Sequence, residues 1–184
     1  MGDARMKTET VPGFFLLEDV DFVRQQKGNP GVAALQKLLP SFDLNKISPI
    51  RKFPLSEEVA LLRAMAIVLY GDDSPESWEK IGAHDFITVR DSSLGKVLLS
   101  LFGKSFPDLI HNGTRLFSYF APFVTFSYRD LSDTGAVFTV EKDPYPKEYY
   151  LGLFRSMVAI FSASGVITVV DKGDRIHEYH LEIR

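Results

Sequence analysis

The fold is decided by residues 123–165, "FVTFSYRDLSDTGAVFTVEKDPYPKEYYLGLFRSMVAIFSASG", along which the spacing of apolar residues changes from strand-like to helical. The pieces "FVTFSYRDL" (123–131) and "GAVFTVEK" (135–142) have the period of two that is typical of half-buried strands. Between them, Ser132-Asp133-Thr134-Gly135 has the composition of a hairpin turn. These residues therefore predict two antiparallel strands joined by a tight turn.

The next segment, 146–163, has helical periodicity instead. Its apolar residues follow i, i+3, i+4, i+7, i+8 and i+11, which makes a wide stripe of Tyr150, Leu153, Phe154, Met157, Val158 and Phe161. Two further strand-like pieces, "GVITVVDK" (165–172) and "RIHEYHLEIR" (175–184), flank Gly173-Asp174. The order β-β-α-β-β predicts a four-stranded antiparallel sheet with one helix on a face.

The chain before residue 122 has helical patterns separated by glycine and proline. Ser56 and Ser74 stand where helix caps are expected, and Gly71 where a helix ends. We predict helices over 30–39, 56–70, 75–82, 92–102 and 107–120. The fold class is α+β, with a flexible tail over 1–12 and a single domain over 13–184. That domain has a helical part, 13–121, and a sheet part, 122–184.

Composition excludes several classes of protein. The 184 residues are 45% hydrophobic, which supplies a real core and excludes disorder. A net charge of −3 gives no reason to expect a nucleic-acid partner. The absence of cysteine excludes disulfides, zinc fingers and thiolate nucleophiles. A polar N-terminus and the lack of about 18 consecutive apolar residues predict no transmembrane segment and a cytoplasmic location.

The histidines do not predict a metal site. The four are His84, His111, His177 and His180. His177 and His180 lie three residues apart on a predicted strand, so their side chains point to opposite faces of the sheet. His180 shares a face with Glu178 and Glu182 and is expected in solvent, while His177 is expected as a hydrogen-bonded residue at the edge of the core. We expect no metal.

No motif for a nucleophile, a phosphate loop or a dinucleotide site is present. The carboxylates, Asp85 and Asp143 among them, cluster at helix starts and in loops, where capping and solubility explain them. We expect no catalytic residues and no enzyme. Tyr145, Tyr149 and Tyr150 stand at the start of the apolar helix, either to orient a polar ligand head or, the interpretation we prefer, to attach the helix to the sheet with their hydroxyls in solvent.

Certain sequence segments resemble those of a known family. They include "VLYG" (68–71), "WEKIG" (78–82), "LG" at 94–95 and at 151–152, and "EYHLEI" (178–183), in the order of elements given above. From about Val11 to Arg184 the chain resembles the haem nitric-oxide-binding (H-NOX) fold, and more closely an uncharacterised myxobacterial family of about two hundred residues. The same superfamily includes the 4-vinyl reductase domain and the TRAPP-type vesicle-tethering subunits, some of which enclose an acyl chain.

The resemblance implies where a haem would be held, and the residues there depart from the family's pattern. The family's iron ligand is a His on the helix before the sheet, at a position that falls near Phe117. No residue from Asn112 to Val124 is a His, and His111 lies more than one helical turn upstream. The family's Tyr-x-Ser-x-Arg motif for the propionates is also unmatched, because Tyr145–Tyr149 is YPKEY. We therefore expect no family-type haem, no other cofactor, and His111 on the helix surface.

Two functions stay open. The first is a non-haem sensory domain that binds an apolar or amphipathic small molecule in an aromatic-lined pocket and serves signalling. The residues expected to line that pocket are Phe117, Phe120, Tyr149, Phe154 and Met157. The second is a protein-interaction module whose pocket is collapsed and filled by those side chains, with a surface such as a sheet edge as its readout. The sequence gives no indication of the oligomeric state or of the ligand.

Overall fold

The computed structural model describes residues 5–102, 105, 108, 112, 115, 117–118, 121–132, 134–160 and 164–183. The chain divides into two compact units, Met1–Ile81 and Gly82–Arg184. This division lies at 81/82, whereas the sequence predicted one domain with its change of character at 121/122. The elements of the first unit are α1 (Arg5–Thr8), β1 (Thr10–Pro12), α2 (Gly13–Leu38), the short 3-10 helix η1 (Leu44–Lys46), β2 (Lys52–Pro54) and α3 (Leu55–Tyr70).

The first unit is a pair of long helices, α2 and α3, with a small two-stranded sheet. Strand β1 pairs antiparallel with β2, and Val11 lies opposite Phe53. Both side chains are buried, with 1% and 4% of their surface exposed, so this pairing contributes to the core. The tail predicted over 1–12 contains two elements, because Arg5–Thr8 form α1 and Thr10–Pro12 form β1. Three residues were too short a segment for a strand pattern to be recognised.

The ends of these helices follow local chemistry. Gly28, with a φ of 65°, interrupts α2 where the sequence places Gly-Asn-Pro, and glycine adopts this left-handed conformation without the steric cost of a side chain. Helix α3 ends at Gly71, also left-handed, as predicted. It begins at Leu55 after Pro54, so the prediction that Ser56 caps it is wrong. Ser74 does act as a cap, since its hydroxyl accepts from the Ser77 N–H at 3.3 Å.

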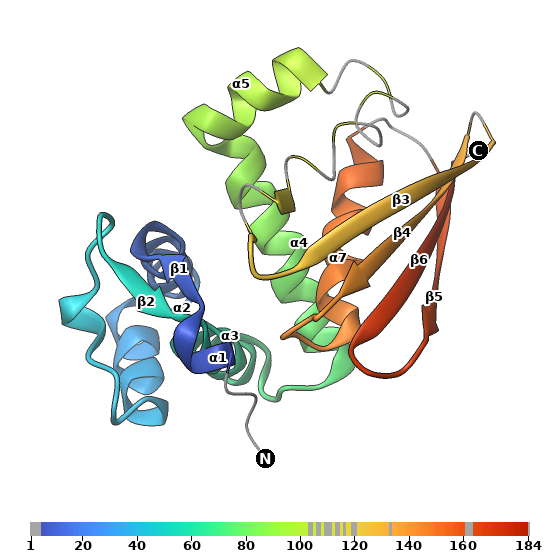
Figure 1. Cartoon of the computed structure of the whole chain (residues 1–184). Coiled ribbons are helices and arrows are strands. Elements are labelled where there is room, and N and C mark those ends of the chain that lie inside the picture. Colours follow the sequence, from blue (N-terminus) through green and yellow to red (C-terminus); the bar gives the residue numbers. More distant parts are fainter. Residues whose placement is uncertain are drawn as a thin grey trace. The chain divides into compact units, whose positions relative to one another are not determined.

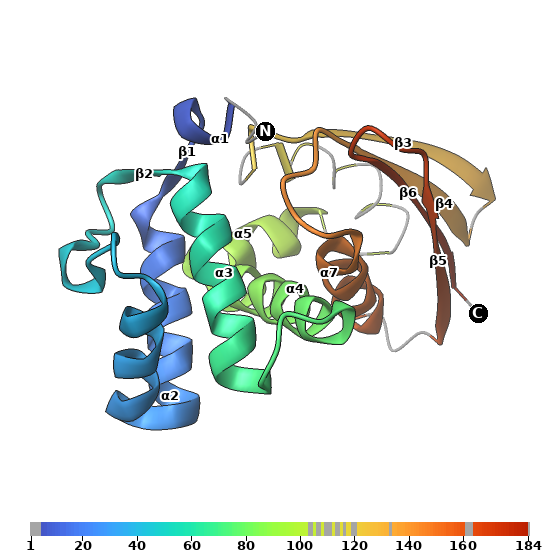
Figure 2. The same ribbon diagram turned by 90° about the horizontal axis from the view of Figure 1, so that it is seen from below.

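The second unit holds the predicted sheet. Helix α4 (Pro75–Asp91) crosses the boundary at Ile81/Gly82, and the elements after it are α5 (Ser93–Phe102), β3 (Thr125–Ser132), β4 (Gly135–Glu141), α7 (Lys147–Ala159), β5 (Gly165–Asp171) and β6 (Ile176–Ile183). The four strands are antiparallel in the order β3-β4-β6-β5. Figures 1 and 2 both show α7 along one face of this sheet. The α+β fold with a β-β-α-β-β sequence of elements is confirmed.

The two faces of the sheet follow from strand alternation. Tyr128, Phe138, Tyr179 and Val169 lie opposite one another across all four strands. Phe138 and Tyr179 are fully buried, because this row faces α7. On β6 the side chains of His177, Tyr179 and Leu181 are buried while Glu182 is exposed, as the sequence predicted. We call the face toward α7 the inner face and the opposite one the outer face.

Two glycines permit close approach of backbones in this unit. A Cβ atom on Gly82 would stand 1.8 Å from the carbonyl oxygen of Tyr149, so α4 and α7 touch here without a side chain between them. A Cβ atom on Gly95 would stand 1.7 Å from the carbonyl oxygen of Val89. Both glycines belong to the sequence segments on which the family resemblance rests. The close backbone contact is a steric reason for glycine at each of these positions.

The orientation of α7 makes a prediction about two of its residues. Met157 is 1% exposed and Arg155 is exposed. Met157→Asp should lower the free energy of unfolding by several kcal/mol, because it buries a charge, whereas Arg155→Leu should change it by less than about 0.5 kcal/mol. Urea unfolding of the two variants beside the wild type measures this. Equal losses in the two variants would contradict the orientation of the helix.

Candidate functional site

Six rings form the centre of the second unit, and we call them the aromatic cluster: Phe117, Phe126, Phe138, Tyr150, Phe154 and Tyr179. Phe138 of β4 and Phe154 of α7 are stacked, with centroids 4.9 Å apart and planes at 25°. Phe117 is stacked on Phe126 of β3 at 4.9 Å and meets the Phe154 ring edge-on at 5.7 Å. Such pairs add about 0.5–1.5 kcal/mol each to the stability that burial provides. The cluster is therefore a rigid block between the sheet and α7.

Phe117 differs from the other rings in its exposure. Phe126, Phe138 and Phe154 are buried, and the last two have no exposed surface. Phe117 is half-buried, and its ring is stacked on Phe126 and meets the rings of Phe138 and Phe154 edge-on. A partly exposed residue backed by buried rings is compatible with an apolar binding wall, and equally with a surface that another protein covers.

The five residues predicted to line a pocket are distributed as follows. Phe117 and Phe154 contact each other in the aromatic cluster. Met157 is buried on the same helix as Phe154. Tyr149 is buried too and joins a neighbouring group of rings. Phe120 lies outside the described residues, and so does His111. That these side chains line an open pocket stays a prediction.

The group around Tyr149 has a polar attachment. The rings of Tyr145 and Tyr149 lie 4.3 Å apart, with Tyr150 5.1 Å from Tyr149. The hydroxyl of Tyr149 donates to Asp85 Oδ2 on α4 at 2.8 Å. The expectation that this hydroxyl is in solvent is therefore wrong, because it joins α7 to α4. The two residues are 64 positions apart, and no local pattern relates them.

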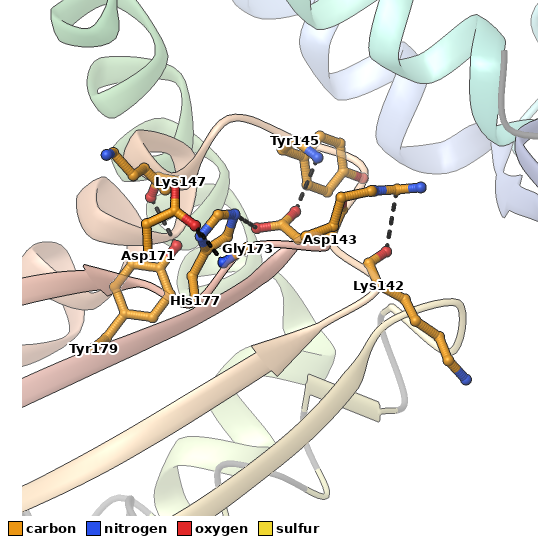
Figure 3. A network of polar contacts seen from close by, with 9 residues as sticks. Lys142, Asp143, Tyr145, Lys147, Asp171, Gly173, His177 and Tyr179 are labelled. Atoms are coloured by element: carbon orange, nitrogen blue, oxygen red, sulfur yellow. Dashed lines mark hydrogen bonds and ion pairs between the residues drawn. The ribbon is translucent and has the colours of Figure 1, made fainter. Parts of the chain in front are cut away.

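A polar network lies beside the tyrosines, where the loop after β4 meets the turn between β5 and β6 (Figure 3). Asp143 is 1% exposed. Its Oδ1 accepts from the Tyr145 N–H at 2.8 Å, and its Oδ2 lies 4.0 Å from Nε2 of His177. The other ring nitrogen of His177, Nδ1, lies 3.8 Å from Asp171 Oδ1. His177 thus stands between two carboxylates, one buried and one exposed.

Burial controls ionisation in this network. Burial raises the pKa of Asp143 well above its usual value, although the Tyr145 N–H and the charge of Arg175 oppose it. Burial also lowers the pKa of His177, against the opposite effect of Asp171. The pKa of the exposed Asp171 is lowered, chiefly because its Oδ1 accepts from the Gly173 N–H at 2.8 Å. The sequence explained Asp143 by capping and solubility; its Oδ1 does accept from a backbone N–H, but the side chain is buried and not solvated. His177 does lie on the core side of its strand.

Main-chain contacts hold the network in place. Arg175 donates from Nε to the carbonyl oxygen of Asp143 at 2.6 Å, and the Asp143 N–H donates back to the carbonyl oxygen of Arg175. Tyr179, a ring of the aromatic cluster, donates its hydroxyl to the carbonyl oxygen of Lys147 at 2.8 Å. The network therefore fixes the start of α7, and with it Phe154, relative to β6.

The residues near Phe117 do not fit a haem ligated at that position. The side chain there is a phenyl ring, which has no lone pair for iron, and it is stacked on Phe126. His84 lies on α4, where its Nε2 is 3.3 Å from the Thr88 hydroxyl and burial lowers its pKa to about 4. His177 and His180 belong to β6. His111, outside the described residues, is not tested.

This architecture is that of the H-NOX proteins. Fe(II) unliganded H-NOX of K. algicida, solved as an alanine-to-glycine mutant, matches with 16% identity over 95% of this chain and 97% of its own, at a TM-score of 0.72. A mutant H-NOX of T. tengcongensis matches with 13% identity, 95% and 98% coverage and a TM-score of 0.74. At such identities the likeness defines the fold alone.

The family is given by the sequence match. Residues 6–182 match the family described as "Protein of unknown function (DUF2378)", and the chain belongs to this family. No curated protein matches it. Among the described residues, no helix has the length and apolar character needed to cross a membrane.

The polar network predicts that its two carboxylates, Asp143 and Asp171, affect the pH dependence of folding stability in different ways. Between pH 3.8, the ordinary pKa, and the raised pKa of native Asp143, the unfolded state loses its proton first, so wild-type stability falls as pH rises. Asp143→Asn removes this loss, so its stability relative to the wild type should increase from about pH 4.5 to about pH 8. Urea unfolding at several pH values measures the difference.

The control for this prediction is Asp171→Asn. The pKa of native Asp171 lies below 3.8, so its stabilising effect is complete above that pH and is lost only in more acidic solution. The stability of this variant relative to the wild type should change less over the same pH range, because only His177, whose pKa the Asp171 charge raises, links this variant to pH there. A change for Asp143→Asn no larger than that for Asp171→Asn would contradict the raised pKa of native Asp143.

Proposed function

We propose that this chain is a sensory ligand-binding domain that works without a His-ligated haem. It accepts an apolar or amphipathic small molecule on the accessible side of the aromatic cluster and serves signalling. The observation that carries the proposal is Phe117, a half-buried phenyl ring stacked on Phe126 at the position that the resemblance gives to the iron ligand. An aromatic surface replaces a coordination site there.

The chemistry of the wall supports this class of ligand. Phe117, Phe126 and Phe154 offer ring faces and edges with no charge, and contact with them removes apolar surface of both partners from water. Burial of apolar surface contributes about 25 cal/mol per Å². The hydroxyl of Tyr149 and the carboxylate of Asp85 in the same unit already bond to each other, so the apolar part of the ligand is what the wall would recognise.

The fold likeness supports the sensory part of the proposal by analogy only. The K. algicida structure is that of an Fe(II) H-NOX protein, and the iron is a property of that protein. For this chain we propose binding without iron, no enzymatic reaction, and a cytoplasmic location.

The second candidate is a protein-interaction module with no small ligand. It is favoured by the full burial of Phe138 and Phe154, whose stacked rings fill the space between β4 and α7. In that case the accessible side of Phe117 is covered by a partner protein. The two functions predict different changes in folding stability and in ligand binding when the Phe117 ring is removed.

The absence of a haem ligand near Phe117 makes the first prediction of this proposal. Purified protein mixed with haemin and reduced should give no sharp Soret band of His-ligated haem. Phe117→His is the matched variant, since it restores an imidazole at the family position, and it should gain such a band. A stoichiometric five-coordinate ferrous spectrum in the wild type, abolished by His111→Ala, would overturn the assignment of this position.

The accessibility of Phe117 makes the second prediction. Phe154→Ala, in the filled core, should cost about 3–5 kcal/mol of stability, and Phe117→Ala clearly less. Phe117→Ala should also weaken the binding of an environment-sensitive fluorescent fatty acid. Urea unfolding and fluorescence titration provide the two measurements. An equal cost in both variants, together with no binding of the fatty acid by the wild type, would favour the interaction module.

A further inference from the structure

Strand β5 (Gly165–Asp171) is an edge of the four-stranded sheet (Figure 1). Among the described strands, only β6 pairs with it. Every second residue of an edge strand directs its N–H and C=O groups away from the sheet, so β5 offers a row of groups for another strand. Its sequence, GVITVVD, has a single charged residue, at its last position, and no proline.

The side chains of β5 are unusually apolar for an exposed edge. Val166 and Val170 are 45% and 39% exposed, and Thr168 between them is exposed as well. These three residues point to the outer face, because they pair with Glu182, Glu178 and His180 of β6. Ile167 and Val169 point to the inner face and are half-buried. β-branched residues of this kind favour pairing with a further strand.

The opposite edge of the sheet, β3, is protected against such pairing. Its register shifts between Asp130 and Ser132, which breaks the regular ladder. It also carries Arg129 and Asp130 within the strand. Charges and irregularities are the usual means by which proteins prevent edge-to-edge association. β5 has no register shift, and its one charged residue, Asp171, is at its end, so the two edges of one sheet differ in the features that control association.

We propose that β5 is a dimerisation strand that pairs antiparallel with β5 of a second copy of this chain. The sequence is self-complementary about Thr168. With the two-fold axis at this residue, Gly165 lies opposite Asp171, Val166 opposite Val170, Ile167 opposite Val169, and Thr168 opposite Thr168. The two Asp171 residues are at opposite ends of the pair, each across from a glycine, so no like charges meet.

The pairing joins two four-stranded sheets into one of eight strands. On the outer face, the valines of the two copies form a continuous strip on either side of the paired threonines. Cross-strand aliphatic and threonine pairs add to the stability that the backbone hydrogen bonds provide. Because β5 matches itself in this way, a second copy of the chain is the proposed occupant of its free edge.

Charge substitutions at the two-fold axis test the register. Wild-type chain should sediment as a dimer at micromolar concentration. Thr168→Lys and Thr168→Glu each place two like charges opposite one another, and each should raise the dimer dissociation constant about tenfold or more. An equimolar mixture of the two variants should restore the dimer, now as a heterodimer. Ser127→Lys, exposed on the same outer face but on β3, is the control and should stay dimeric.

Cross-linking gives an independent readout, because the chain has no cysteine of its own. Thr168→Cys should be joined into a covalent dimer by a short bismaleimide, and Ser127→Cys should not. A monomeric wild type at all concentrations overturns the proposal and leaves the edge to a strand of another protein. A wild-type dimer that neither charge at position 168 weakens also overturns it. Far-ultraviolet circular dichroism of each variant verifies that the fold is intact.

Discussion

The stack of Phe138 on Phe154 is the contact on which the second unit depends. It joins the central strand β4 to α7, and neither ring has any exposed surface. Tyr179 of β6 lies 5.0 Å from Phe154, so the same helix residue also contacts the neighbouring strand. Because these rings fill the space between sheet and helix, the other rings of the aromatic cluster are positioned relative to them. Phe117 is the partly exposed residue at the edge of the aromatic cluster.

The polar groups around the cluster have a supporting role. Asp143, Arg175 and His177 fix the start of α7 against the turn between β5 and β6, and the Tyr149–Asp85 hydrogen bond joins the helix to α4. A buried carboxylate is costly unless it is neutral or paired, so the network is a sensitive point of the fold. These contacts hold the start of α7 and its rings in place, and a preorganised apolar surface of the kind proposed would bind a ligand with little loss of conformational freedom.

The sequence predicted those features that depend on local periodicity. The stripe of α7, the two hairpins, the burial of alternate residues on β6 and the glycine end of α3 all follow from spacing or from one residue's conformational preference. Features that depend on distant contacts were missed. Asp143 has the local context of a solvated loop residue, and its burial arises only when the β5–β6 turn meets it. Tyr149 and Asp85 are related only through the approach of α7 to α4 at Gly82. The pairing of Thr10–Pro12 with Lys52–Pro54 was missed for the same reason, because it joins segments that are distant in the sequence.

The central claim is that the accessible side of Phe117 is a ligand-binding wall, and fluorine NMR tests it most directly. 4-Fluorophenylalanine placed singly at position 117, and in a second sample at position 138, reports on an accessible ring and on a fully buried one. Titration with a medium-chain fatty acid should shift the resonance at 117 in a saturable manner and leave that at 138 nearly unchanged. No shift at 117 at a saturating concentration would contradict the account.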